Sequence, residues 1–313
     1  MLSSVFAPEA DLAIVSLSRR AMATQWQVLL PVNTPEPARL GYDLFELLDR
    51  LESQMTVYRP DSEVSRLNRQ AGRGAMRVEA RLYDLLQLAG RLHIQTQGCF
   101  DAAIGSLLKA WGFFKPPRRV PTPEELEALR WGWQHVALSE PNTVHITRPG
   151  VEINLGSIGK GYALDRLVER LTRRWKIGTA LLHGGSSSLY AKGDPHGSGR
   201  GWAVDIRHPW QRQRLLHRVY LRDRALGTSA ATFQHLIHEG KRLGHVLDPR
   251  TGWPASGLES VSVLAPSAAL ADALSTAFFV GGLELAQSYI AAHPEIAAVL
   301  LPTGSGSPVI LGE

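Results

Sequence analysis

The order of helix-like and strand-like segments constrains this chain of 313 residues more than any other feature. Apolar residues recur at helical spacing in 44–55, 82–92 and 164–171. Strand-like runs occupy 25–30, 143–147, 202–206, 215–221 and 261–264. A doubly wound fold needs strands and helices to alternate regularly, and these segments do not. We therefore expect an α+β fold, with mixed, mainly antiparallel sheets packed with helices.

Composition sets the class of protein. Hydrophobic residues make up 44% of the chain and charged residues 20%, which excludes a disordered chain. Cys99 is the single cysteine, so a disulfide framework and a multi-cysteine zinc or iron–sulfur site are excluded. The pair Gly184-Gly185 between the strand-like runs 179–182 and 187–191 predicts a hairpin.

The chain start does not read as a secretory signal. Pro8, Glu9 and Asp11 interrupt what would be its apolar stretch. The longest apolar candidate elsewhere, 271–280, contains Asp272 and is too short to cross a membrane. We expect a cytoplasmic protein without a transmembrane segment.

Positive charge concentrates in one segment. The whole chain carries a formal net charge of +5, and seven arginines lie between Arg200 and Arg224. Nucleic-acid binding is one interpretation, but no pattern of stacking aromatic residues accompanies the arginines. A solvated face of a β-ribbon is favoured, and we expect no nucleic-acid partner.

A glycine-rich turn occupies 154–165, with the sequence NLGSIGKGYALD. The glycine spacing is not that of a Walker motif, because two residues separate Gly156 from Gly159 and a glycine follows Lys160. Such a strand-to-helix turn can bind a phosphate through backbone N–H groups and the lysine. A simple tight turn is an equal alternative on this pattern alone.

Two further segments carry candidate chemistry. Asp272, Ser275 and Thr276 share one helix face and form a set of hard oxygen ligands suited to Mg²⁺, although Asp272 as a helix cap is the simpler interpretation. His245 precedes a turn built on Asp248 and Pro249; it is either a packed residue or a general base.

Two other segments resemble catalytic motifs but are incomplete. Gly227-Thr228-Ser229-Ala230-Ala231 lacks the last glycine of a hydrolase elbow, and His235 and His238 lack the glutamate of a zinc-protease helix.

Taken in order, these segments resemble the ApbE-type FAD:protein FMN transferase family from about Arg20 to about Ile290. The resemblance rests on the following segments: Met22-Ala23-Thr24, Tyr58-Arg59-Pro60-Asp61-Ser62-Glu63 with Leu67-Asn68, Gly98-Cys99-Phe100-Asp101, Leu107 with Trp111-Gly112-Phe113, 154–165, Gly184-Gly185, Trp202 to Pro209, 245–252 and Asp272-Ala273-Leu274-Ser275-Thr276-Ala277. It implies residues 1–19 as a leader, residues 20–313 as the transferase domain, and a flavin cleft between two lobes.

The resemblance also implies the activity. Members transfer FMN from FAD to a Ser or Thr hydroxyl of an acceptor flavoprotein through a phosphoester bond, with Mg²⁺, and release AMP. Carried over by position, the FAD-binding residues are Met22, Tyr58, Cys99, Phe100, Asp101, Asn154, Lys160 and Val246. The metal ligands are Ser157, Asp272, Ser275 and Thr276. His245 becomes the candidate base for the incoming hydroxyl, and Lys160 neutralises phosphate charge.

The sequence departs from the family pattern in four places. Asn154 stands where the family usually has an acidic residue, and Ser186 where it has Asp or Asn. The segment 228–232 lacks the usual glycine and tyrosine, and Ala23 replaces a glycine. Two alternatives therefore stay open: a non-catalytic FAD-binding or flavin-delivery protein, and an FAD pyrophosphatase that releases FMN and AMP.

Overall fold

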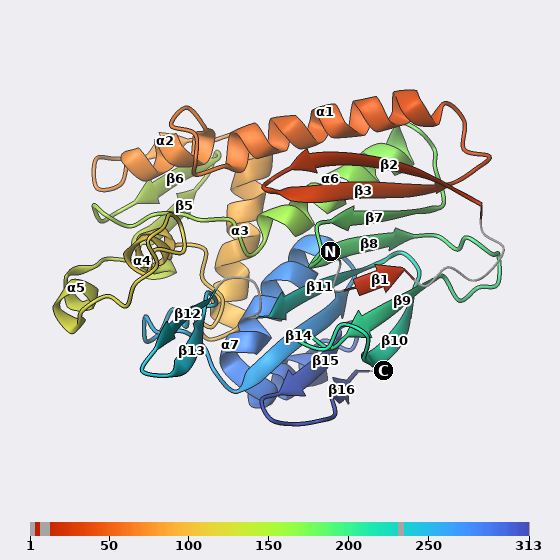
Figure 1. Ribbon diagram of the computed structural model, residues 1–313. Helices are drawn as coiled ribbons and strands as arrows, with labels where there is room; N and C mark the ends of the chain where they lie inside the picture. The colour runs from red at the N-terminus through yellow and green to blue at the C-terminus, as the bar shows by residue number, and fades with distance from the viewer. Residues whose placement is uncertain (1–3, 7–12, 231–234, 313) are drawn as a thin grey trace.

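The computed structural model describes residues 4–6, 13–230 and 235–312, and an antiparallel sheet of eight strands forms its centre (Figure 1). The strand order is β16-β15-β14-β11-β8-β7-β3-β2, and every pairing in it is antiparallel. Smaller sheets, in the orders β1-β9-β10, β4-β6-β5 and β12-β13, flank it. The predicted α+β class with mainly antiparallel sheets is confirmed.

The central strands are β2 (Ile14–Ala21), β3 (Thr24–Pro31), β7 (Ala180–Gly184), β8 (Ser188–Lys192), β11 (Arg224–Ala230), β14 (Leu258–Ala265), β15 (Ala297–Pro302) and β16 (Val309–Leu311). The flanking strands are β1 (Ser4–Phe6), β4 (Met76–Arg77), β5 (Val136–Ser139), β6 (Thr143–Ile146), β9 (Trp202–Arg207), β10 (Leu215–Leu221), β12 (His235–His238) and β13 (Lys241–Gly244). The helices are α1 (Pro37–Met55), α2 (Glu63–Arg69), α3 (Ala80–Gln95), α4 (Gly105–Ala110), α5 (Pro123–Ala128), α6 (Gly159–Arg173) and α7 (Ala268–Ala292), with a 3₁₀ turn at Trp133–His135.

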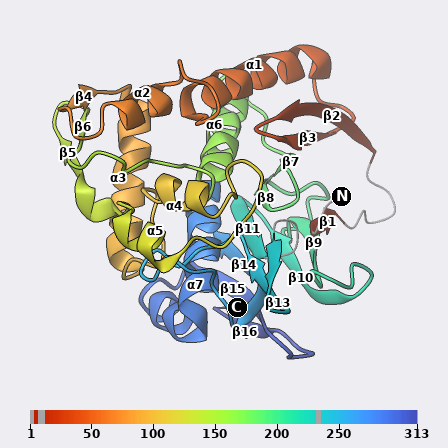
Figure 2. The same ribbon diagram turned by 60° about the vertical axis from the view of Figure 1, so that its left-hand side comes forward.

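The two faces of the central sheet are covered differently. Helices α1, α6 and α7 lie on one face, where the largest hydrophobic core forms (Figures 1 and 2). The sheet β1-β9-β10 closes the other face over a second core that includes Leu181, Trp202 and Val204. A third, small core under α4 and α5 holds Leu107, Trp111 and Leu247.

The starts of α6 and α7 approach each other closely, and glycine makes this approach possible. A Cβ added to Gly161 of α6 would lie 2.0 Å from the carbonyl oxygen of Ala268, and one on Gly227 of β11 would lie 2.5 Å from the carbonyl carbon of Ala271. The carboxylate of Asp165 accepts the backbone N–H groups of Ala268 and Ala269 at 2.7 and 2.9 Å. Both glycines thus fix where the first turns of α7 lie.

Helix α7 is the one helix of the described residues that is long and apolar enough to cross a membrane. However, 61% of its most apolar stretch is buried inside the fold. Gly282 also interrupts it with non-helical angles, φ 74° and ψ −167°, so two shorter helices meet there. Its apolar residues therefore serve the core. The helix begins at Ala268, three residues before the start near Ala271 that the sequence suggests.

The N-terminal part differs from the sequence expectation. The strand expected at 25–30 is present as β3, but β2 precedes it and pairs with it from Ile14 to Ala21. The boundary expected between residues 19 and 20 therefore falls inside a strand. The hairpin expected around Gly184-Gly185 is confirmed as the antiparallel pair β7 and β8.

Gly161→Ala tests the close approach of α6 and α7. Because the new methyl group would meet a backbone carbonyl, we expect a loss of about 2 kcal/mol in the free energy of unfolding. Gly178→Ala is the matched control, since nothing lies within 4 Å of that position. Urea denaturation of both variants measures the difference, and equal stability would contradict the packing described.

His183, which is 1% exposed in β7, gives the fold a pH dependence. Burial lowers the pKa of His183 to about 4, below its ordinary value of 6.5. The unfolded chain therefore takes up a proton before the folded chain does. The part of the free energy of unfolding that depends on neutral His183 is fully present above pH 6.5. It is lost as the pH falls from 6.5 to 4, by about 3 kcal/mol over the whole window. In denaturation curves at several pH values, His183→Gln should lose this part of the slope.

Candidate active site

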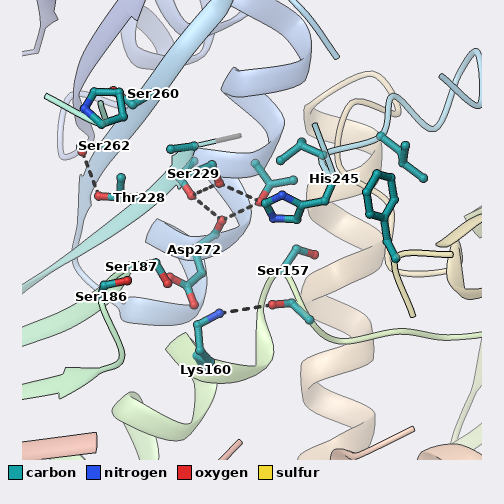
Figure 3. A pocket seen from close by; sticks show the side chains of 18 of the residues that line it. Ser157, Lys160, Ser186, Ser187, Thr228, Ser229, His245, Ser260, Ser262 and Asp272 are labelled. Atoms are coloured by element: carbon teal, nitrogen blue, oxygen red, sulfur yellow. Dashed lines mark hydrogen bonds between the residues drawn. The ribbon is translucent and has the colours of Figure 1, made fainter. Parts of the chain in front are cut away.

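A cavity of about 390 Å³ opens where β8 and β14 begin and β11 ends, beside the starts of α6 and α7 (Figure 3). It brings together residues that are far apart in the sequence. The predicted site residues that line it are Tyr58, Cys99, Asp101, Asn154, Ser157, Lys160, His245, Val246, Asp272, Ser275 and Thr276. The small core under α4 and α5 forms its opposite wall through Leu108 and Leu247.

Two predicted residues lie elsewhere. Phe100 is completely buried in the main core, so its ring does not reach the cavity. Met22 lines an adjoining hollow of about 260 Å³. Tyr58, Asn154 and Lys160 line both spaces, which places Met22 next to the cavity without facing it.

Asp272 is the buried anion of the cavity. Its Oδ2 accepts the backbone N–H of Gly161 at 2.8 Å, and it also bonds to the hydroxyl of Ser188. Burial raises the pKa of Asp272 to about 6, although the positive charge of Lys160 acts in the opposite direction. The capping role is excluded, because the hydroxyl of Ser267 accepts the N–H of Leu270 at the start of α7. Because burial outweighs these contacts, a cation in the cavity would stabilise the ionised carboxylate further.

Hydroxyl groups gather at the backbone carbonyl of Asp272. Ser275 and Thr276 donate to the carbonyl of Asp272 at 2.9 and 3.3 Å, one helical turn back. Ser229 of β11 joins them, with its Oγ 2.9 Å from Ser275 Oγ and 3.2 Å from Thr276 Oγ1. Dashed lines in Figure 3 mark these hydrogen bonds beside Ser229 and Asp272. The sequence patterns that contain Ser229, an incomplete hydrolase motif and the divergent segment 228–232, did not predict its place in the site.

The donor set fits magnesium better than a transition metal. Within the described residues, no three His, Cys, Asp or Glu side chains are grouped to hold a metal ion. Mg²⁺ differs because it binds through one or two carboxylates and keeps water and phosphate oxygens as its other ligands. Asp272 with the hydroxyls of Ser275 and Thr276 meets that need, and Ser157 lines the same cavity from the glycine-rich turn.

The glycine-rich turn is held by its own side chains. The Oδ1 atom of Asn154 accepts the N–H of Gly156 at 2.9 Å, and Lys160 Nζ lies 3.5 Å from the Gly156 carbonyl. An aspartate at position 154 would accept the N–H of Gly156 equally well. Asn154, in place of the family's acidic residue, therefore keeps the shape of the turn and removes one negative charge. The turn ends where α6 begins, at the cavity wall.

Aromatic rings line one part of the cavity. Tyr58, which is 63% exposed, stacks on Phe114 with ring centroids 4.6 Å apart and an interplanar angle of 3°. Phe113 lies 6.4 Å from the ring of His245, edge to face. Phe113 and Phe114 line the cavity in place of Phe100. The segment Trp111-Gly112-Phe113 was the signal in the sequence, but no role was assigned to it.

His245 and Cys99 both line the cavity, but only His245 is suited to a chemical role. His245 follows β13 directly, whereas Cys99 is 2% exposed. Burial raises the pKa of Cys99, which keeps the thiol protonated and makes it a packing residue rather than a nucleophile.

Comparison with known proteins agrees with this geometry. The model of the ApbE family matches residues 22–300. Proteins named FAD:protein FMN transferase are similar to the chain: one from Treponema pallidum is 34% identical, covering 83% of this chain and 76% of that protein. One from Escherichia coli is 29% identical, covering 88% and 81%.

Solved structures show the same fold. The ApbE protein from Thermotoga maritima superposes with a TM-score of 0.85 at 27% identity, covering 95% of this chain and 96% of that one. The flavin transferase ApbE from Vibrio cholerae gives 0.83 at 27% identity, covering 96% and 97%. Family model, relatives and structures span nearly the whole chain and the cavity described above, and the chain therefore belongs to the ApbE family.

Proposed function

We propose that this chain is a Mg²⁺-dependent FAD:protein FMN transferase. It moves FMN from FAD to a Ser or Thr hydroxyl of an acceptor flavoprotein, forms a phosphoester bond and releases AMP. One observation carries the proposal: a buried, undercompensated carboxylate, Asp272, lines the same cavity as Lys160 and His245. The relatives named FAD:protein FMN transferase support it.

In this proposal the phosphates of FAD bind between the first turns of α6 and α7. Asp272, Ser275, Thr276 and Ser157 would hold Mg²⁺, which supplies positive charge to the bridging diphosphate and to the departing AMP. Lys160 adds a second positive charge from the start of α6. The side chains thus lower the repulsion that two anionic phosphates present to an incoming hydroxyl.

The transfer step balances with groups of this chain. The oxygen of the acceptor hydroxyl forms a bond to the FMN phosphorus, and the bond from that phosphorus to the AMP oxygen breaks with its electron pair leaving on AMP. His245 accepts the hydroxyl proton. The stacked pair of Tyr58 and Phe114 would offer an aromatic surface for the flavin ring beside the cavity.

The direct test combines the purified chain with FAD, Mg²⁺ and a panel of apo-flavoproteins. We expect AMP in solution and a covalently bound flavin on an acceptor, measured by chromatography and intact mass. AMP with free FMN and no labelled acceptor would instead assign a pyrophosphatase. FAD binding without either product would leave a flavin carrier and reject the transferase.

Asp272→Asn tests the cation site. We expect FMN transfer to fall at least 100-fold and the stabilisation by Mg²⁺ with FAD to disappear. Stability without ligand should not fall at pH 7.5: the raised pKa of Asp272 means that its ionised form already disfavours folding above about pH 6.

Asp165→Asn is the matched control for this variant. Burial also raises the pKa of Asp165 to about 6, but this carboxylate binds the start of α7 and is not among the residues that line the cavity. It should keep the response to Mg²⁺ with FAD in thermal denaturation. A loss of that response in both variants would mean that any damage to α7 removes it.

His245→Gln separates proton transfer from binding. We expect transfer to drop about 10²- to 10⁴-fold because no base remains for the acceptor hydroxyl. The Kd for FAD should stay within about twofold, because Gln keeps a polar side chain beside Phe113. Rapid-quench assays and flavin fluorescence measure the two quantities; an unchanged transfer rate would remove His245 from the mechanism.

A further inference from the structure

The hairpin β12–β13 stands apart from the large sheet (Figures 1 and 2). Leu236 and Leu243 anchor it to the small core under α4 and α5. The chain then runs straight from the last residue of β13, Gly244, into His245 and Val246 of the cavity wall. Residues 235–244 do not line the cavity, so forming the cavity wall does not explain why the hairpin is there.

The pairing register shows which backbone groups point away from the hairpin. Glu239 and Gly240 form a two-residue turn with φ angles of 49° and 72°. His238 and Lys241 close it, and the next pair, Ile237 with Arg242, lies at a position without mutual hydrogen bonds. The same holds for His235 with Gly244. The N–H and C=O groups of these four residues therefore point outward.

The two outer edges of the hairpin differ. On β12, Arg118 Nη1 donates to the outward carbonyl of His235 at 3.3 Å, so this edge faces the segment that follows Phe114. On β13, residues 4–6, 13–230 and 235–312 provide no further backbone partner for Arg242 and Gly244. Arg242 is exposed and Gly244 is buried, so the edge of β13 leads from solvent into the fold.

The surroundings of this edge are cationic. The guanidinium group of Arg242 lies 4.4 Å from the ring centroid of Trp210, a residue of the segment between β9 and β10. Arg207 and Arg212 of the same region line the cavity. An occupant of the β13 edge therefore meets a positively charged rim, which favours an acidic segment.

We infer that β13 is the docking strand for the acceptor. An extended, acidic segment of the acceptor protein lies antiparallel to β13 and exchanges main-chain hydrogen bonds with Arg242, the exposed residue of this edge. Further along β13, in the direction of Gly244, its Ser or Thr hydroxyl arrives beside His245. This inference rests on the proposed function, because it gives the transferred FMN a destination.

Two proline variants of one residue pair test the docking strand. Arg242→Pro removes the outward N–H of β13, and Ile237→Pro removes the equivalent N–H of β12; neither deletes a hydrogen bond of the hairpin. The probe is a 12-residue peptide with one Thr among Asp residues, assayed with FAD and Mg²⁺. We expect Arg242→Pro to raise the KM for the peptide at least tenfold and Ile237→Pro to change it less than twofold.

Arg242→Ala distinguishes the charge from the edge. It keeps the N–H, so we expect a smaller rise in KM that high salt abolishes, whereas the effect of Arg242→Pro persists in salt. Equal losses in the two proline variants, or none in Arg242→Pro, would overturn the docking strand. So would labelling of a protein acceptor but not of the peptide. Absence of transfer by the unaltered chain, with FAD bound, would reject the proposed function itself.

Discussion

The contact between the starts of α6 and α7 is the constraint on which the site depends. The N–H of Gly161 reaches the carboxylate of Asp272 only because residue 161 has no side chain in the way of Ala268. Asp165, one turn along α6, binds the first backbone groups of α7 from the same side. The two helices therefore bring a lysine and a carboxylate, 112 positions apart in the chain, to one cavity, with Gly227 of β11 closing the arrangement from the sheet.

Much of the fold follows from local patterns. Helices α1, α3 and α6 have clear apolar faces, and β9, β10 and β14 follow short apolar or alternating runs. Strand β2 was not predicted because it lies at the edge of the sheet, with Ser16, Ser18 and Arg20 exposed. An edge strand of this kind gives little hydrophobic signal.

The sequence predicted some residues of the site correctly and others not. Residues of linear motifs, such as Lys160 and Asp272, reach the cavity because the turn or helix that carries them is itself recognisable. Phe100 did not, because spacing cannot tell which way a ring points after a helix ends. Its ring is buried in the main core, and Phe113 and Phe114 line the cavity instead. Ser229 shows the same limit, since only the register of β11 against β14 and its approach to α7 gives that hydroxyl its neighbours.

The polar edge formed by β2 also affects how molecules of this protein meet in solution. In the described part of the chain, the outer side of β2 has no partner strand, and it carries Ser16, Ser18, Arg19 and Arg20. Arginines there repel the same edge of another copy and are poorly suited to a dry sheet-to-sheet junction. The charge therefore disfavours edge-to-edge pairing of the central sheets of two molecules through β2.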